Sequence, residues 1–417
     1  MANLVGARIE RKEDKKFLTG KGRYTADITL PNQTYAYFVR SPHARAKITK
    51  VDTSKAMKAP GVIDVFTGDC VVKDKIGGLI CGWKIVSQDG KDMKCPPHPV
   101  LAKDSVNFVG DHVAVVVAET LEQAKNAAEL VNVNYKLQKA VVKIEKATSS
   151  ENIHEGIDNN LSFDFLLGDK GKTEEAFSKA DKIVKLDIVN NRLIPNAMEP
   201  RAAIGDYNTS SDELTLYTAS QNPHLDRLIM SAFNAVHPEH KFRIVAPDVG
   251  GGFGSKINVY AEDVIVAYAS KKIGRPVKWV AERSESFMSD NHGRDHFTHA
   301  ELALNSDSKI IGLKVDTIAN LGAYSLVLAA VTPTYLYAPL LLGIYDIPTA
   351  CCTVKGVYTN TAPTDAYRGA GRPEATYVIE RIVTEAAKEI GMDQAEFRKK
   401  NFIKKFPHQQ CLVHNID

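Results

Sequence analysis

The sequence contains no CxxC cysteine motif. Six cysteines occur among the 417 residues, at positions 70, 81, 95, 351, 352 and 411, and no two of them form a CxxC motif. Zinc ribbons and iron–sulfur clusters usually draw their ligands from such motifs, so neither is expected in this chain. Cys351 and Cys352 are adjacent, and on a strand their side chains would point to opposite faces.

A strong charge excess and a secretory segment are also missing. The formal net charge is +3, and no basic patch dominates the sequence, so nucleic acid is not an expected partner. The longest basic cluster, at 398–400 with Lys404 and Lys405, is typical of a solvated helix face and tail. No apolar secretory stretch follows Met1, which predicts a reducing, cytoplasmic location.

One uncharged segment, residues 321–345, is long enough to span a bilayer. It contains Pro333, Pro339 and several hydroxyl-bearing side chains. Proline interrupts a helix, and unsatisfied polar groups are costly in lipid. We therefore expect a buried loop-and-helix segment beside a substrate cavity, and no membrane span.

The composition, with 44% apolar and 25% charged residues, is that of a soluble globular protein of two or three domains. The run 112–118 predicts a strand and 121–131 predicts a helix, at whose start Thr120 and Gln123 have the spacing of a capping box. Strands and helices continue in mixed order along the chain, which indicates an α+β fold.

The polar, turn-rich stretch 146–162 predicts a linker, which divides the chain into a domain at 1–145 and a domain at 163–417. In the second domain the apolar spacing predicts a helix over 260–272. It also predicts a last long helix that opens at Pro373.

The most distinctive stretch, Asp248 to Lys256, reads DVGGGFGSK. Glycines permit positive φ and let a ligand approach the backbone, and bare amides at the start of a helix favour an anion. The spacing matches neither a Walker A loop nor a dinucleotide fingerprint, because Ser255 stands where each motif needs glycine. Taken alone, the loop favours a structural tight turn.

Two further segments point to a ligand. Residues 365–374 read DAYRGAGRPE, and the guanidinium of Arg368 beside glycine amides suits an anionic group. Residues 220–224 read SQNPH, and the Gln221 amide can both donate and accept a hydrogen bond. Each segment alone is equally consistent with a solvent-exposed turn.

Together these segments resemble the large, molybdenum-binding subunit of the xanthine oxidase family, which includes aldehyde oxidases and aerobic carbon monoxide dehydrogenases. The resemblance covers essentially the whole chain. GRYTAD at 22–27 and RSPHA at 40–44 resemble the aldehyde oxidase/xanthine dehydrogenase a/b hammerhead domain, and NAMEPR at 196–201 resembles the opening of the first molybdopterin-binding domain. The implied fold class is α+β, with the hammerhead domain followed by that molybdopterin-binding α+β domain.

The resemblance also implies roles for individual residues. Gln221 is similar to the glutamine that hydrogen-bonds the apical oxo group of molybdenum. Gly252, Phe253 and Gly254 are similar to the loop whose backbone contacts the cofactor near the metal, and Arg368 to the arginine of the loop on the metal's substrate side. The expected cofactor is molybdenum–molybdopterin in its cytosine dinucleotide form. The pterin supplies sulfur ligands, so no protein metal ligand is expected.

Two departures narrow the implied chemistry. Molybdenum–copper carbon monoxide dehydrogenases carry a copper-binding cysteine where this chain has Gly369, so its AYRGAGR loop resembles the form II relatives instead. Xanthine-oxidising members have a glutamate where this chain has Ile257, and a substrate-binding arginine in the region between Arg294 and Arg368, where this chain has none. Purine oxidation is therefore disfavoured.

Large subunits of this family are much longer than this chain. Their second half contributes the remaining cofactor contacts and the glutamate that acts as general base, so no catalytic residue is expected here. Glu199 is the nearest carboxylate by motif, and we interpret it as structural. His292, His296 and His299 come nearest to a metal-binding group, for which a structural role is again favoured.

The leading hypothesis is an oxidoreductase subunit, the N-terminal half of a molybdenum hydroxylase large subunit, which hydroxylates a carbon centre with water-derived oxygen. Its expected partners are the C-terminal half of the large subunit, an FAD-binding medium subunit, a [2Fe–2S] small subunit and a small-molecule substrate. The alternative is a truncated, non-catalytic or assembly-only chain that does not retain cofactor. A weaker third hypothesis is a generic phosphate- or nucleotide-binding protein.

Overall fold

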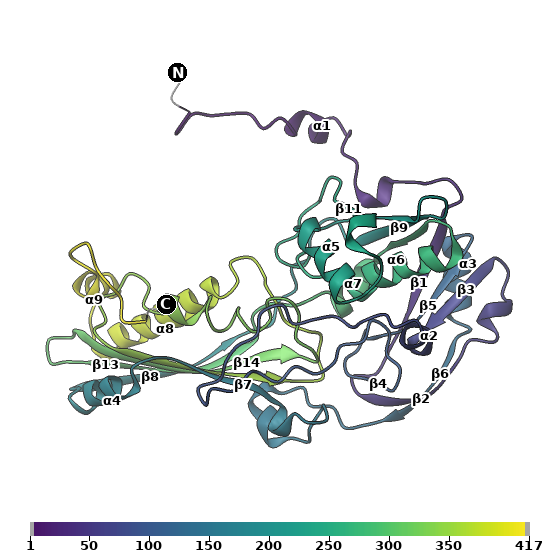
Figure 1. Cartoon of the computed structure of the whole chain (residues 1–417). Coiled ribbons are helices and arrows are strands. Elements are labelled where there is room, and N and C mark those ends of the chain that lie inside the picture. The colour runs from purple at the N-terminus through teal and green to yellow at the C-terminus, as the bar shows by residue number, and fades with distance from the viewer. Residues whose placement is uncertain (1–3, 413–417) are drawn as a thin grey trace.

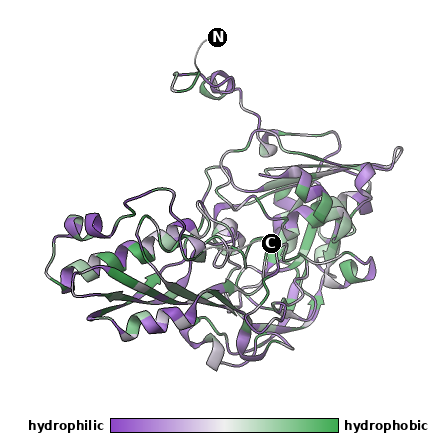
Figure 2. Ribbon diagram, turned by 60° about the vertical axis from the view of Figure 1, so that its left-hand side comes forward, coloured by the Kyte–Doolittle hydropathy of each residue, from purple (hydrophilic) through white to green (hydrophobic). Residues whose placement is uncertain are grey.

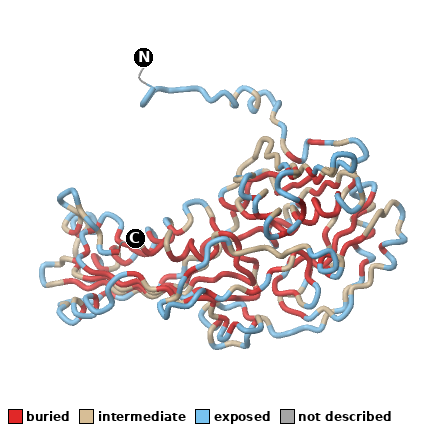
Figure 3. The backbone as a smooth tube through the Cα atoms, viewed as in Figure 1, coloured by how far each residue is buried: buried red, intermediate tan, exposed pale blue. Residues whose placement is uncertain are grey.

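The computed structural model describes residues 4–412 and arranges them in two lobes with an arm that stands away from one of them (Figure 1). One lobe is built on a seven-stranded sheet and the other on a five-stranded sheet. The arm, residues 4–23, contains the short helix α1 (Asp14–Leu18). Buried residues follow the two sheets and the helices that cover them, whereas the arm is exposed (Figure 3).

The seven-stranded sheet has the order β11-β10-β9-β12-β1-β5-β3. Its strands are β1 (Thr34–Arg40), β3 (Val62–Thr67), β5 (His112–Ala118), β9 (Ala202–Asn208), β10 (Glu213–Thr218), β11 (Phe242–Val245) and β12 (Val277–Val280). Thr34 on β1 lies opposite Val277 on β12 in a parallel pair, so the sheet unites strands from both predicted domains. β5 is buried along its whole length, which suits its unbroken apolar run.

Five helices belong to this lobe. They are α2 (Gly68–Lys73), α3 (Leu121–Ala128), α5 (Pro223–Ala232), α6 (Ala261–Ile273) and α7 (Arg283–Ser289). Hydrophobic residues gather in the sheets and in the helices that cover them (Figure 2), and α6 packs against β9. The approach is so close that a Cβ atom at Gly205 would lie 2.6 Å from the backbone oxygen of Val266. Any larger residue at position 205 would therefore push the helix off the sheet.

The second lobe contains a five-stranded sheet of order β7-β15-β14-β13-β8. Its strands are β7 (Leu161–Gly168), β8 (Lys182–Asn190), β13 (His296–Leu304), β14 (Ile310–Gly322) and β15 (Ala350–Tyr358). Helix α8 (Arg372–Glu389) covers one face, α4 (Lys170–Ser178) lies on the other, and α9 (Gln394–Asn401) packs against α8 (Figure 1). Ile379, Ile382, Val383 and Ala386 give α8 a buried face at helical spacing.

A three-stranded sheet, β4-β2-β6, completes the predicted hammerhead domain. Its strands are β2 (Ala46–Asp52), β4 (Ser105–Val106) and β6 (Asn132–Leu137). Short 3₁₀ helices occupy residues 25–27, 56–58, 144–149, 158–160, 239–241 and 338–340. Two of them lie in or overlap the predicted linker 146–162. The domain boundaries themselves stay a prediction.

The three helices predicted from the strongest local sequence patterns are present in the structure. The helix expected at 121–131 is α3, where the Thr120 hydroxyl accepts a hydrogen bond from the Gln123 N–H at 3.2 Å. The helix expected at 260–272 is α6, which ends at Gly274 in the left-handed conformation. The helix expected to open at Pro373 is α8, which starts one residue earlier.

One expectation about the glycine loop is wrong. Residues 255–260 separate Gly254 from the start of α6, so the loop does not open the helix. The Tyr260 hydroxyl donates to the backbone oxygen of Ser255 at 2.7 Å and fixes the intervening segment as a buried turn. A helix dipole acts only within its first turn, so it does not act on the loop amides.

The uncharged segment 321–345 folds into turns and one 3₁₀ helix, Ala338–Leu340, and most of its residues are buried. The helical part of this segment is limited to that 3₁₀ turn, because Pro333 and Pro339 interrupt the chain. Among residues 4–412, no helix is long and apolar enough to cross a membrane. Cys351 and Cys352 lie side by side on β15, and both are buried because both faces of that sheet are covered.

Candidate functional site

The three predicted segments meet where the two lobes adjoin. The side-chain oxygen Oε1 of Gln221 accepts a hydrogen bond from the Gly254 N–H at 2.9 Å. The Arg368 N–H donates to the backbone oxygen of Phe253 at 3.0 Å, and the Gln221 N–H donates to that of Lys256 at 2.8 Å. Backbone bonds therefore join the glycine loop to both of its neighbours, and the predicted site residues Gln221, Phe253, Gly254 and Arg368 form one surface.

Two glycines of this loop leave room for neighbouring segments. Gly254 has a φ of +103°, and a Cβ atom there would lie 2.1 Å from the backbone oxygen of Ala366. A Cβ atom on Gly252 would lie 2.3 Å from Oε1 of Gln221. Phe253, between them, holds a φ of 54°, which is strained for a residue with a side chain. The close approach of three segments is therefore built into the sequence of the loop.

The side chains of this surface face outward. Gln221 and Arg368 are exposed, and Phe253 is 42% exposed. The Arg368 guanidinium lies over the Phe253 ring, 5.7 Å from its centroid. Because the Gln221 oxygen is used by Gly254, the amide NH2 group is the part left to donate to a ligand. The surface is thus an open wall rich in hydrogen-bond donors.

Glu199 and Lys256 brace the loop from within. Oε2 of Glu199 accepts hydrogen bonds from the Gly250 N–H at 2.7 Å and from the Lys256 ammonium at 2.8 Å. Lys256 is 3% exposed, and burial lowers the pKa of its ammonium although Glu199 partly opposes that change. Oε2 of Glu199 therefore holds the loop, as a structural residue would, whereas its Oε1 is buried without a hydrogen-bond partner among the described residues.

A buried ion network lies beside this brace, with Glu262 of α6 at its centre. Its two oxygens accept from the Arg201 guanidinium at 2.9 and 3.0 Å and from Arg40 at 2.8 Å, and His112 Nε2 lies 2.9 Å away. Burial alone would raise the pKa of Glu262, but the attraction of Arg201, His112 and Arg40 holds it well below its usual range. Arg40 on β1 and His112 on β5 thereby fix the predicted hammerhead domain to α6.

Arg294 holds the Arg368 loop in place, much as Glu199 and Lys256 hold the glycine loop. The Arg294 guanidinium donates to the backbone oxygens of Tyr367 at 3.0 Å and Arg368 at 2.8 Å, and to Oε1 of Glu374 at 3.1 Å. Arg294 and Glu374 are both buried, so each neutralises the other. One buried ion pair therefore sets the positions of two carbonyl groups in the loop.

The three histidines do not converge on a common point. His299 Nδ1 lies 2.7 Å from the Asp187 carboxylate, and His296 is buried farther along β13. Burial, together with the nearby charge of Arg192, lowers the pKa of His292 to about 4, so its ring is neutral at pH 7. Within the described residues 4–412, no group of three or more His, Cys, Asp or Glu side chains is placed to hold a metal ion.

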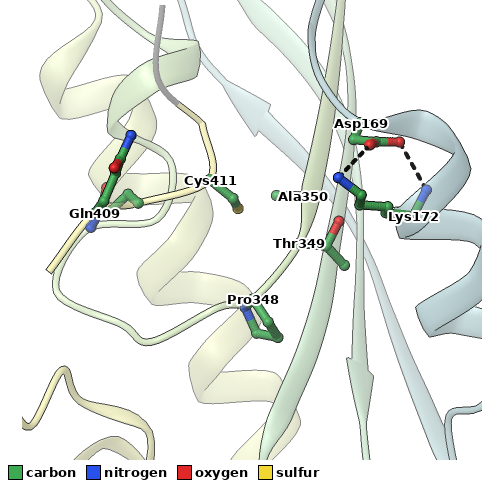
Figure 4. A pocket seen from close by; sticks show the side chains of 8 residues that line it. Asp169, Lys172, Pro348, Thr349, Ala350, Gln409 and Cys411 are labelled. Carbon is green, nitrogen blue, oxygen red and sulfur yellow. Dashed lines mark hydrogen bonds and ion pairs between the residues drawn. The ribbon is translucent and has the colours of Figure 1, made fainter.

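A hollow of about 420 Å³ lies elsewhere, in the lobe of the five-stranded sheet (Figure 4). Its lining includes Asp169, Lys172, Pro348, Thr349, Gln409 and Cys411. The Asp169 carboxylate accepts from the Lys172 N–H at 2.9 Å and pairs with its ammonium at 3.2 Å. These charges satisfy each other, so the hollow presents no arrangement that we can assign to a ligand.

Sequence reasoning missed most of the supporting residues. Glu199 was noticed through its motif, and Glu374 ends the DAYRGAGRPE segment. No sequence spacing indicated that Glu374 pairs with Arg294, because the two residues lie far apart in the sequence. For Lys256, the local sequence signal of a supporting role was its position directly after the glycine loop and Ser255.

Comparison with known families identifies the domains of the chain. Residues 153–402 match the model of the molybdopterin cofactor-binding domain. Residues 19–139 match the aldehyde oxidase and xanthine dehydrogenase a/b hammerhead domain. The chain belongs to the xanthine oxidase, aldehyde oxidase and carbon monoxide dehydrogenase large-subunit family. The resemblance and the α+β fold class drawn from the sequence are both confirmed.

Individual relatives show how much of the family's length is present. The chain is 36% identical to the carbon monoxide dehydrogenase large chain of Hydrogenophaga pseudoflava, over 95% of this chain and 50% of that one. It superposes on the crystal structure of quinoline 2-oxidoreductase from Pseudomonas putida 86 with a TM-score of 0.91 and 30% identity, covering 98% of this chain and 52% of that one. The chain thus spans about half the length of these relatives.

A third relative is closer in length. The nicotinate dehydrogenase large molybdopterin subunit of Eubacterium barkeri is 29% identical over 95% of this chain and 88% of its own length. At least one similar protein is therefore of a length comparable to that of this chain.

Proposed function

We propose that this chain is the N-terminal half of a molybdenum hydroxylase large subunit of the form II carbon monoxide dehydrogenase and xanthine dehydrogenase-like type. It would take part in the hydroxylation of a carbon centre with oxygen derived from water. The observation that carries this proposal is the meeting of Gln221, Phe253 and Arg368 on one open wall, in a chain that matches a molybdopterin-binding domain.

The residues of the wall suit a cofactor that brings its own metal ligands. They offer the Gln221 NH2 group, the backbone amides of residues 251–253 and the Arg368 guanidinium, all of which are hydrogen-bond donors to oxygen-rich or anionic groups, whereas the Gly250 and Gly254 amides are bound by Glu199 and Gln221. Molybdenum–molybdopterin, in its cytosine dinucleotide form, would supply oxygen transfer and electron uptake when bound. Gln221 would orient the group, the backbone of Gly252, Phe253 and Gly254 would contact it, and Arg368 would flank the substrate side.

The remaining parts of the enzyme lie outside this wall. Glu199 is bound to Gly250 and Lys256, so it is a poor candidate for a general base. The base and further cofactor contacts would come from the C-terminal half of the large subunit, which the roughly half-length match to relatives supports. An FAD subunit and a [2Fe–2S] subunit would take up the electrons in a cytoplasmic complex.

The conformation at Gly369 favours a centre without copper. This residue has a φ of +97°, and a Cβ atom would lie 2.6 Å from Cδ of Pro373. A cysteine at this position would therefore be strained in the present loop. The loop geometry supports the form II assignment over a molybdenum–copper centre.

Metal analysis of the assembled complex tests the proposal. The tagged chain is purified from its native host with its associated polypeptides. We expect stoichiometric molybdenum and no copper. A complex without molybdenum would support an assembly-only chain, and substantial copper would overturn the interpretation of Gly369. A screen of aldehydes, N-heterocycles and carbon monoxide on the molybdenum-loaded complex would then identify the substrate class.

A further inference from the structure

The N-terminal arm, residues 4–23, is the part of the described chain that departs most clearly from the body. It stands away from the seven-stranded lobe in Figure 1, and residues 4–13 are exposed throughout (Figure 3). Its helix α1 has only five residues and no buried side chain. A helix this short is marginal in water. The contacts of α1 with the root of the arm and the rim include the Lys16–Asp248 ion pair and the stacking of Phe17 on Tyr24, and a further surface would stabilise it.

The arm is attached at the rim of the candidate site. The Arg23 N–H donates to Oδ2 of Asp248 at 2.8 Å, and Lys16 forms an ion pair with the same carboxylate. Tyr24 forms a bridge with Asp248, two residues before the glycine run begins. A Cβ atom on Gly250 would touch the ring of Tyr24 at 3.4 Å. The root of the arm and the glycine loop are therefore in contact.

The composition of the arm is unusual for a solvated tail. Leu4, Ile9 and Leu18 are 64%, 62% and 86% exposed. The arm also has seven basic and three acidic side chains, an excess that is larger than the net charge of +3 of the whole chain. Apolar side chains on a cationic segment fit a partner surface with an apolar groove and acidic side chains around it.

The apolar character continues onto the rim itself. Met198, next to Glu199, is 90% exposed, and Phe253 is 42% exposed. Phe253 belongs to the glycine loop, and Met198 adjoins it through the hydrogen bond from the Gly250 N–H to Glu199, so both exposed side chains lie near the root of the arm. A polypeptide that covers this rim would therefore meet the arm as well.

We propose that the arm is a docking element, and that it clasps the polypeptide carrying the second half of the molybdopterin site. This inference rests on the proposed function, in which that half lies outside the chain. The arm leaves from the rim that such a polypeptide must cover, and the covering surface is acidic and apolar. A second copy of this chain, or a different subunit, would be alternative occupants, and the test separates them.

The test compares hydrogen–deuterium exchange in the isolated chain and in the complex assembled in its native host. We expect amides in the arm to exchange at least about tenfold more slowly in the complex, since helix α1 gains a surface to pack on. Cross-links from Lys12, Lys15 and Lys21 should reach the second molybdopterin-binding domain. Equal exchange in both samples overturns the proposal, and so do cross-links that reach only another copy of this chain or only another subunit.

Point variants provide a second measurement. The double variant Ile9→Asp, Leu18→Asp should reduce co-purification of the completing polypeptide at least about tenfold, because two apolar side chains no longer become buried. Val189→Asp, at a similarly exposed position on the edge strand β8, is the matched control and should leave assembly unchanged. An equal effect of both variants, or no effect of either, overturns the proposal.

The two proposals fail in different ways. A protected arm in a complex that contains no molybdenum would reject the proposed function and keep the docking role. An unprotected arm in a molybdenum-loaded complex would keep the function and reject the docking role.

Discussion

Oε1 of Gln221 accepts a hydrogen bond from the backbone N–H of Gly254, at 2.9 Å. This single contact joins two segments of the candidate site and decides which end of the amide is available. The oxygen is occupied by the loop, so only the NH2 group can reach a ligand. A glutamine in this position combines a structural acceptor with a donor for the ligand, and the two roles can be separated by substitution.

The variant Gln221→Glu should separate them. A carboxylate still accepts from Gly254 but cannot donate, so we expect an unchanged thermal midpoint and a turnover of the assembled enzyme about 100-fold lower. Gln221→Ala loses both roles and should also loosen the glycine loop. The measurements are turnover, thermal unfolding and the electron paramagnetic resonance signal of molybdenum. Wild-type turnover in Gln221→Glu would remove this residue from the cofactor's surroundings.

Gly254→Ala should break the joint between the glycine loop and the Arg368 loop. The new Cβ atom would lie 2.1 Å from the Ala366 oxygen at a φ of +103°, so strain and overlap add. We expect the free energy of unfolding to fall by about 3 kcal/mol or more, measured by urea denaturation. Gly156→Ala is the matched control, because its φ is +75° and a Cβ atom there meets nothing within 4 Å. Similar losses in the two variants would show that the contact with Ala366 is unimportant.

Glu199→Gln should be costly because it leaves a buried ammonium without its counter-charge. Lys256 is 3% exposed, and Glu199 Oε2 accepts from it at 2.8 Å. Removal of one partner of a buried ion pair lowers the free energy of unfolding by about 3–5 kcal/mol. The double variant Glu199→Gln, Lys256→Met should recover part of that loss, because no charge then remains buried. Denaturant unfolding of the native chain, the single variants Glu199→Gln and Lys256→Met and the double variant forms a double-mutant cycle, and purely additive effects would contradict a direct pair.

Arg294→Lys should loosen the Arg368 loop without unfolding the lobe. A lysine keeps the charge near Glu374 but cannot reach both carbonyl oxygens that the guanidinium now binds at 3.0 and 2.8 Å. We expect faster amide exchange confined to residues 365–372. Arg275→Lys, at a pair with Glu119 on the surface, is the control and should show no such change. Unchanged exchange in the loop would indicate that Arg294 does not position it.

The features that were predictable from the sequence depend on residues close together in the chain, whereas the unpredictable ones depend on contacts between distant residues. Helix α3 was predictable because Thr120 and Gln123 form a local capping box. The three loops of the site were found because their motifs are short and resemble those of a known family. The parallel pairing of β1 with β12 was not predictable, since it joins residues more than two hundred positions apart.

Local signals also misled in one place. Gly254 precedes a helix-forming stretch, but the Tyr260 hydroxyl bonds to the Ser255 backbone and inserts a buried turn before α6. Side-chain hydrogen bonds of this kind depend on the folded surroundings. The roles of Gln221, Phe253 and Arg368 toward a cofactor stay predictions, although their convergence is now a property of the structure.

Stability should depend on pH through Asp226, which follows Gln221 closely at the start of α5. Burial raises the pKa of Asp226 to about 7, and the hydrogen bond from Ser220 opposes this only partly. In the unfolded chain an aspartate titrates near pH 3.9. The folded state therefore holds the proton more tightly, and its contribution to stability is complete below about pH 4 and is lost as pH rises toward 7. The loss amounts to at most about 4 kcal/mol.

Asp226→Asn removes this titration while its amide oxygen can still accept the Ser220 hydrogen bond. Compared with the native chain, the variant should be similarly stable near pH 4 and progressively more stable up to pH 8. Urea unfolding of both proteins at steps of pH across this range provides the measurement. A difference that stays constant with pH would show that Asp226 is charged in the folded protein at all these values, and that the buried carboxyl is stabilised by contacts beyond Ser220.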